Sequence, residues 1–251
     1  MILHIGLLWR RALLETLRQP VWVLTGLTAP LLYLALFAPL LDRLAGGPGF
    51  SRGSVLDVFL PGILCLMAFG AGMGAGWVVI AEAQTGVVER LRSTPASRFA
   101  LVAGAMLRDV VAFLVPAALV VAVAVPFGYS PDAAGLALLL LLLALVTAAT
   151  SAWSAALGLL IGDVGGLAAV VTGLQLPLTL LAGVLLPLSL APGWLRGLAH
   201  VDPLYYAVEA ARDLSAGTIG TATVAVGFAV TGALAVVTIG WATRTYRAAR
   251  M

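Results

Sequence analysis

The sequence predicts an all-α polytopic membrane protein with six transmembrane helices, an N-terminal amphipathic interface helix and short re-entrant helices before the last span. Its 251 residues are 62% hydrophobic and 10% charged, whereas soluble domains are about half apolar and about a quarter charged. The mean hydropathy is +1.09. A helix needs about 20 apolar residues to cross ~30 Å of hydrocarbon, so residues 1–251 are expected to form one transmembrane domain.

The composition also disfavours several kinds of function. The chain contains no lysine, and a P-loop nucleotide site needs a lysine that reaches the phosphates. The arginines lie beside apolar runs, which suits lipid phosphates better than a nucleic acid. His4 and His200 are far apart and Cys65 is the single cysteine, so a metal site, a Ser-His-Asp site and an intrachain disulfide are not expected. We therefore expect neither an enzyme nor a nucleic-acid-binding protein.

The N-terminal part predicts an interface helix followed by a span. Residues 1–19 mix apolar side chains at helical spacing with three arginines and Glu15, a pattern typical of a helix at the membrane surface. The arginines follow the first apolar residues, unlike those of a cleavable signal, so the mature chain is expected to begin at Met1. Residues 21–41 carry no charge and form the first span, which prolines within it can kink.

Five further apolar runs predict the other spans. We expect them at residues 58–81, 110–127, 133–162, 164–190 and 221–243. Residues 42–57 are a loop rich in glycine and proline, and residues 82–98 are a charged segment between the second and third spans. Residues 99–109 lead from that segment into the third span, and residues 191–220 form a polar stretch before the sixth.

The distribution of arginine predicts the orientation, because basic residues gather on the cytoplasmic side. With six spans and the N-terminus inside, ten of the 14 basic residues fall on that side. They are Arg10, Arg11, Arg18, Arg90, Arg92, Arg98, Arg108, Arg244, Arg247 and Arg250. Both termini and residues 82–98 are therefore expected in the cytoplasm, and residues 191–220 on the opposite side.

The predicted spans contain no charged side chain. Glu82, Asp109 and Asp163 fall at span ends, where we expect them to be solvated. An ion-driven carrier usually keeps such residues deep in the membrane, where they pair or relay protons. The energy for transport is therefore expected to come from another molecule.

Polar and small residues within the spans suggest a transport path and close helix packing. Most hydroxyl groups are expected to bond to their own helix. Gln175 has an amide to satisfy, and Pro177 frees backbone carbonyls nearby, so Thr172, Gln175 and Thr179 either line a transport path or join helices. The glycines at 70–76 and 158–166 predict close approach of helices, with a ligand groove as the alternative.

Two motifs point to a family. One is Glu89-Arg90-Leu91-Arg92-Ser93-Thr94-Pro95-Ala96-Ser97-Arg98, between the second and third spans. The other is Asp202-Pro203-Leu204-Tyr205-Tyr206-Ala207-Val208-Glu209-Ala210-Ala211-Arg212, before the last span. With the six-span layout, they resemble the type-two ABC transporter permeases, the transmembrane subunits of drug and polysaccharide exporters such as the daunorubicin-resistance permeases. Asp202 stands where asparagine is commoner, and either residue can cap a helix.

The resemblance implies two functional segments. Residues 82–98 would couple the permease to an ATPase through Glu89, Arg90, Arg92, Thr94, Pro95 and Arg98; the alternative is that the arginines only hold lipid phosphates. Residues 191–220 would form extracytoplasmic re-entrant helices, with an outer gate made of Asp202, Pro203, Tyr205, Tyr206, Glu209 and Arg212. The alternative for this segment is an amphipathic loop with interfacial aromatic residues.

The resemblance also implies partners and cargo. Two permeases, either a homodimer or a pair with a close homologue, would bind two ATPase subunits that hold ATP and magnesium, so this chain itself would need no cofactor. We expect it to contact membrane lipids in a bacterial inner membrane and to export an amphipathic, drug-like or antibiotic-like molecule. The alternatives are a permease for lipid-linked polysaccharide and an integral membrane enzyme acting on lipids.

Overall fold

The structure is a computed structural model, and it describes residues 26–33, 35–36, 55–87, 98–184, 188 and 191–248. Within these ranges the regular elements are helices, with no β-strand, as the all-α prediction requires. Residues 26–33 and 35–36 are helical, but the predicted interface helix and the rest of the first span lie outside the described residues. So do Glu89, Arg90, Arg92, Thr94 and Pro95 of the predicted coupling segment.

Five described helices are long and apolar enough to cross a membrane. They comprise α3 (Val55–Met73) with α4 (Ala75–Gln84), α6 (Arg98–Ala124), α7 (Ala133–Ile161), α8 (Val164–Leu181) and α11 (Ala222–Ala248). A short 3-10 helix, η2 (Val125–Phe127), extends α6. Two short helices, α9 (Gly193–Ala199) and α10 (Pro203–Ser215), precede α11. A multi-pass membrane protein with short helices before the last span was therefore correctly predicted.

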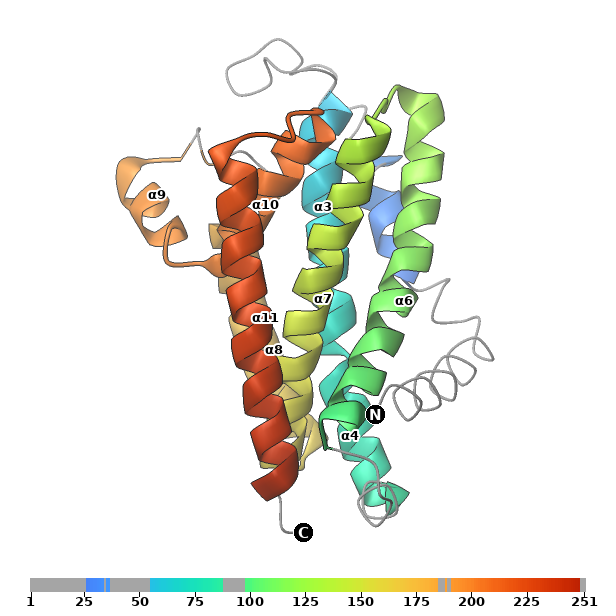
Figure 1. Cartoon of the computed structure of the whole chain (residues 1–251), viewed down its shortest axis with the longest axis vertical. Coiled ribbons are helices and arrows are strands. Elements are labelled where there is room, and N and C mark those ends of the chain that lie inside the picture. Colours follow the sequence, from blue (N-terminus) through green and yellow to red (C-terminus); the bar gives the residue numbers. More distant parts are fainter. Residues whose placement is uncertain are drawn as a thin grey trace.

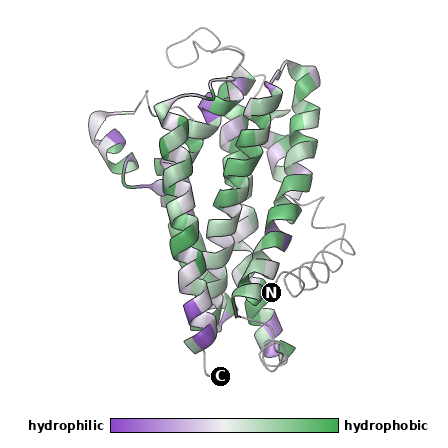
Figure 2. Cartoon of the chain, in the orientation of Figure 1, coloured by the Kyte–Doolittle hydropathy of each residue, from purple (hydrophilic) through white to green (hydrophobic). Residues whose placement is uncertain are grey.

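The helices form a bundle around α7, which contacts α3, α4, α6, α8, α10 and α11. The end of α4, the start of α6, the α7–α8 turn and the end of α11 lie at one end of the bundle (Figure 1). The start of α3, the α6–α7 turn and the α10–α11 turn lie at the other end. Hydrophilic residues gather toward these ends, whereas the middle is mainly hydrophobic (Figure 2). Successive spans thus run in opposite directions, as in a polytopic bundle.

Two predicted span limits were wrong. The third span was expected to begin at residue 110, but α6 begins at Arg98 and runs for 27 residues, about 40 Å at 1.5 Å per residue. The fifth was expected to continue to residue 190, but α8 ends at Leu181. Gly183 then adopts a positive φ of 66°, a left-handed conformation that ends a helix and that glycine adopts readily.

Three of the glycines at 70–76 and 158–166 confirm the packing prediction, since Gly72, Gly76 and Gly158 lie against another helix, whereas Gly70 and Gly162 have open space beside them. A Cβ atom on Gly76 would lie 2.6 Å from the Ser154 carbonyl oxygen, and one on Gly158 would lie 2.6 Å from the Gly76 carbonyl oxygen. Both distances are shorter than real contacts, so α4 and α7 approach as closely as they do only because neither residue has a side chain. Small residues allow this approach in membranes, where lipid gives helices no hydrophobic reason to associate.

Candidate functional site

The predicted outer gate centres on α10, which begins at Pro203 after a capping aspartate. The Asp202 carboxylate accepts a hydrogen bond of 2.9 Å from the Leu204 amide, and Pro203 occupies the first helical turn, where its missing N–H costs nothing. The other carboxylate oxygen, Oδ2, is buried without a hydrogen-bond partner in the described structure. This burial raises the pKa of Asp202 to about 6.

Arg212 ties α10 to two other parts of the bundle. Its guanidinium donates to the Gly183 carbonyl at 2.6 Å, to the Val58 carbonyl at 3.4 Å and to the Glu209 carboxylate at 2.7 Å. The planar guanidinium presents five N–H donors in a fixed geometry, which allows it to serve three acceptors together. Two of the predicted gate residues, Glu209 and Arg212, therefore form one network that holds the segment after α8 and the start of α3.

The aromatic residues of the predicted gate lie together near the start of α10. The ring centroids of Tyr205 and Tyr206 are 5.2 Å apart, and those of His200 and Tyr205 are 5.1 Å apart. The Tyr206 hydroxyl donates to the His200 carbonyl at 2.9 Å. Burial, followed by the neighbouring Glu209 carboxylate, raises the pKa of Tyr205. The structure thus brings all six predicted gate residues onto one helix and its N-cap.

The other end of α10 is fixed by a hydrogen bond that the sequence analysis missed. The Tyr129 hydroxyl lies 2.9 Å from the Ser215 hydroxyl, and Tyr129 is fully buried in the turn between α6 and α7. Burial raises the pKa of Tyr129. A buried tyrosine hydroxyl usually has a partner, but nothing in the local sequence identifies Ser215, which lies 86 positions away.

The predicted transport-path residues lie on α8, which is largely uncovered. Leu174, Leu176 and Leu180 are exposed on this helix. Thr172 is exposed and Gln175 is half-buried, and we find no hydrogen-bond partner for the Gln175 amide within the described ranges. The Thr179 hydroxyl bonds back to the Gln175 carbonyl at 2.8 Å, as expected for a threonine satisfied within its own helix.

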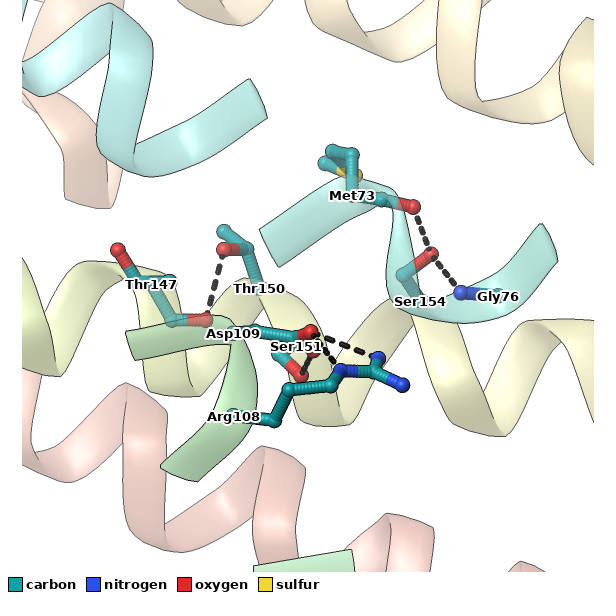
Figure 3. Close-up of polar contacts among 8 residues, drawn as sticks. All are labelled: Met73, Gly76, Arg108, Asp109, Thr147, Thr150, Ser151 and Ser154. Carbon is teal, nitrogen blue, oxygen red and sulfur yellow. Dashed lines mark hydrogen bonds and ion pairs between the residues drawn. The ribbon is translucent and has the colours of Figure 1, made fainter. Parts of the chain in front are cut away.

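Asp109 is not solvated, contrary to the sequence prediction. Its side chain is only 8% exposed. One carboxylate oxygen accepts a 2.6 Å hydrogen bond from the Ser151 hydroxyl of α7, and the other accepts from the Arg108 guanidinium at 2.7 and 2.8 Å. In Figure 3 the carboxylate lies between these two partners. The prediction failed because α6 begins earlier than expected and packs this residue against α7. The exposed Asp163, by contrast, caps α8.

Ser154, one turn along α7 from Ser151, bonds to the junction between α3 and α4. Its hydroxyl donates to the Met73 carbonyl at 2.5 Å and accepts from the Gly76 amide at 3.0 Å. Figure 3 shows both contacts, which join the residues on either side of the break between the two helices at Gly74. The expectation that hydroxyls bond to their own helix holds for Thr150, but Ser151 and Ser154 join different helices.

The sequence profile of the ABC-2 type transporter family matches residues 4–215. The chain belongs to this family. It is therefore a transmembrane subunit of an ABC transporter, a multi-pass membrane protein that works with an ABC ATPase partner.

Within the described ranges, no group of three His, Cys, Asp or Glu side chains could hold a metal ion.

Similar proteins agree with this assignment. The daunorubicin resistance ABC transporter permease protein DrrB1 of Streptomyces coeruleorubidus is 26% identical over 96% of this chain and 84% of its own length. The ycf38 protein of Cyanophora paradoxa, which carries the name of a transport permease, is 27% identical over 85% of this chain and 74% of its own length. The ycf38 protein of Porphyra purpurea is also 27% identical, over 86% of this chain.

Within this ABC-2 permease, sequence reasoning also did not find the two contacts between helices made by Ser151 with Asp109 and by Ser154 with the α3–α4 junction. A signal was present, since Thr147, Thr150, Ser151 and Ser154 recur at spacings of one helical turn and so share a face of one helix. An acidic residue between apolar stretches of α6 was the natural partner for such a face.

Proposed function

We propose that this permease exports an amphipathic small molecule, of the drug or antibiotic class, across a bacterial inner membrane. The observation that carries the proposal is similarity over 96% of the chain to a permease named for daunorubicin resistance. The exposed apolar surface of α8, with Thr172 and Gln175 on it, would suit a cargo that has both apolar and hydrogen-bonding groups.

The proposed assembly contains two permeases and two ATPase subunits, with ATP and magnesium bound by the ATPases alone. The two permeases are either identical copies or close homologues. Residues 82–98 would dock on the ATPase through Glu89, Arg90, Arg92, Thr94, Pro95 and Arg98. The segment 191–220 would close the path on the opposite side, with Arg212 holding α10 in place.

Reconstitution of the permease with its ATPase tests the function. ATP-dependent movement of daunorubicin from the side of the membrane that carries the ATPase to the opposite side would support export. Movement toward the side that carries the ATPase would contradict it. Transport of a lipid-linked oligosaccharide instead would favour a polysaccharide permease. Steady ATP hydrolysis or lipid turnover by the purified chain alone would overturn the assignment of a permease without its own nucleotide site.

The proposed orientation places both termini and residues 82–98 in the cytoplasm. It is tested with single cysteines in a Cys65→Ala background, since Cys65 is buried and its small side chain should be replaceable. Ser51→Cys and Gly217→Cys should react with an impermeant reagent in intact spheroplasts, whereas Ser93→Cys should not. Labelling of Ser93→Cys without labelling of Ser51→Cys would reverse the orientation.

A further inference from the structure

Two serines of α7 hold two different helices. Ser151 bonds to the Asp109 carboxylate of α6 at 2.6 Å, and Ser154 bonds to the α3–α4 junction through Met73 and Gly76. Ser151 and Ser154 are three residues apart, so they are neighbours on the helix surface. One short stretch of α7 therefore fixes two separate helices.

The two helices held in this way flank the proposed coupling segment. α4 ends at Gln84 and α6 begins at Arg98, so these helices flank residues 85–97, which make up most of the charged segment of residues 82–98. Any displacement of that segment pulls on α4, on α6 or on both. α7 is the helix to which each of them is hydrogen-bonded through a buried serine.

The contacts that Ser151 and Ser154 make are suited to transmit a displacement of α4 or α6 to α7. Asp109 is a buried carboxylate, and a buried charge that loses its partners carries a large desolvation penalty. Arg108 lies on α6 and would move with Asp109, whereas Ser151 lies on α7, so sliding of α6 along α7 would separate the carboxylate from its described hydrogen-bond partner on α7. Gly72, Gly76 and Gly158 have no side chains, so the backbones of α3, α4 and α7 are in direct contact. Such close packing leaves these helices little room to move relative to one another.

We propose that Asp109, Ser151 and Ser154 form a positioning site, here called the α7 anchor, that transmits movement of residues 82–98 to α7. The inference rests on the proposed coupling role of that segment. α7 also contacts α10 and α11, so a displacement at the α7 anchor reaches the helix that carries the predicted outer gate. Asp109, Ser151 and Ser154 thus act on transport through α7, without contact with cargo or nucleotide.

The test compares transport per ATP hydrolysed in the complete complex with its ATPase. Ser151→Ala and Ser154→Ala should keep ATP hydrolysis within about twofold of the parent but lower daunorubicin transport per ATP at least about fivefold. Asp109→Asn should retain most of the coupling, because its amide can still hydrogen-bond to Ser151, whereas Asp109→Leu should not. Thr238→Ala is the matched control, since it removes a buried hydroxyl that bonds only within α11.

A second measurement does not depend on cargo. Ser130→Cys, in a Cys65→Ala background, places a reporter in the exposed turn beside the start of α7. Trapping ATP on the partner should change its rate of modification in the parent complex but not in the Ser151→Ala/Ser154→Ala double variant.

The outcomes separate the α7 anchor from the proposed function. If the parent shows the ATP-dependent change in cysteine modification but no daunorubicin transport, the proposed cargo is wrong. The α7 anchor is then tested by the Ser130→Cys reporter alone. No change in the parent would overturn ATP coupling, and the α7 anchor with it. An unchanged response in the double variant, or equal losses of ATP hydrolysis and transport in both single variants, would reduce these serines to a structural role.

Discussion

Arg212 and Gly183 are joined by a hydrogen bond of 2.6 Å, from the guanidinium of α10 to the backbone carbonyl just after α8. This carbonyl lies two residues beyond Leu181, where α8 ends. The same guanidinium reaches the Val58 carbonyl near the start of α3. A single side chain thereby fixes the position of α10 relative to two other segments.

Replacing Arg212 by methionine should destabilise the protein. The change leaves the Gly183 carbonyl and the Glu209 carboxylate without their donor, and a buried acceptor left unsatisfied costs about 1–3 kcal/mol. Arg212→Lys should retain part of this stability, because an ammonium cannot reproduce the planar fork. The measurement is thermal unfolding of the purified protein in detergent. Arg196→Met is the control, since Arg196 makes one exposed contact to a carbonyl; an equal loss in both variants would contradict the assignment.

Asp202 should make stability depend on pH. Burial raises its pKa to about 6 in the folded protein from an ordinary 3.8, so the folded state binds the proton more tightly than the unfolded state. Stability should therefore be greatest below about pH 4 and fall as pH rises through 6, by up to roughly 2 kcal/mol. Asparagine is an equally good N-cap without a charge. Asp202→Asn should accordingly be more stable than the parent at pH 7.5 and lose the pH dependence between 4 and 6.

The control for this prediction is Asp132→Asn. Asp132 caps α7 with hydrogen bonds of 3.1 Å to two backbone amides, but from an exposed position. Melting temperatures measured at pH 4 and pH 7.5 give the comparison. If Asp202→Asn and the parent respond to pH alike, the buried carboxylate is not the group that titrates.

The proposed coupling segment should be essential for transport but not for membrane insertion. Replacing Glu89, Arg90 and Arg92 together by alanine removes the charges that would dock on the ATPase, so transport should fall at least tenfold. Transport is measured as cargo uptake by vesicles. Binding of the ATPase is measured by how much of that subunit is recovered when the permease is purified. Arg244→Ala with Arg247→Ala is the control, because the end of α11 lies at the same end of the bundle (Figure 1). Parental transport by the triple variant would show that those arginines serve as lipid anchors.

The sequence predicts most of the described spans well because a span depends mostly on local properties. The length and hydropathy of α7 or α11 are sufficient, whatever their neighbours. The end of α8 is less predictable, since residues 182–190 are as apolar as the helix before them. That end depends on a positive φ at Gly183 and on the carbonyl contact with Arg212, which lies 29 positions along the chain.

The α7 anchor was missed for a related reason. Asp109 and Ser151 are separated by 42 positions, and neither residue alone distinguishes a buried partner from a solvated helix end. By composition, Asp109 lies close to the limit of an apolar run. Only the packing of α6 against α7 decides that protein rather than water surrounds its carboxylate. The predicted gate residues needed no such information, since a capping residue and a single helix bring them together.

Gln175 should influence which molecules the transporter carries. It is half-buried on a helix whose neighbouring surface is apolar and exposed, and a polar group in hydrocarbon needs a hydrogen-bonding partner to avoid a cost of several kcal/mol. Neither a described helix nor its own backbone supplies one for the amide. A wet path or the cargo itself would satisfy it.

Gln175→Leu should therefore change the concentration of daunorubicin that half-stimulates ATP hydrolysis, by about threefold or more, while assembly with the ATPase is preserved. A threefold change is less than 1 kcal/mol, within the range of one hydrogen bond. Thr243→Val is the control, because its hydroxyl bonds within α11 to the Ile239 carbonyl at 2.8 Å. The comparison should include an uncharged apolar cargo, which has less need of the amide. Identical responses to every cargo in an assembled Gln175→Leu complex would mean that this amide takes no part in selecting cargo.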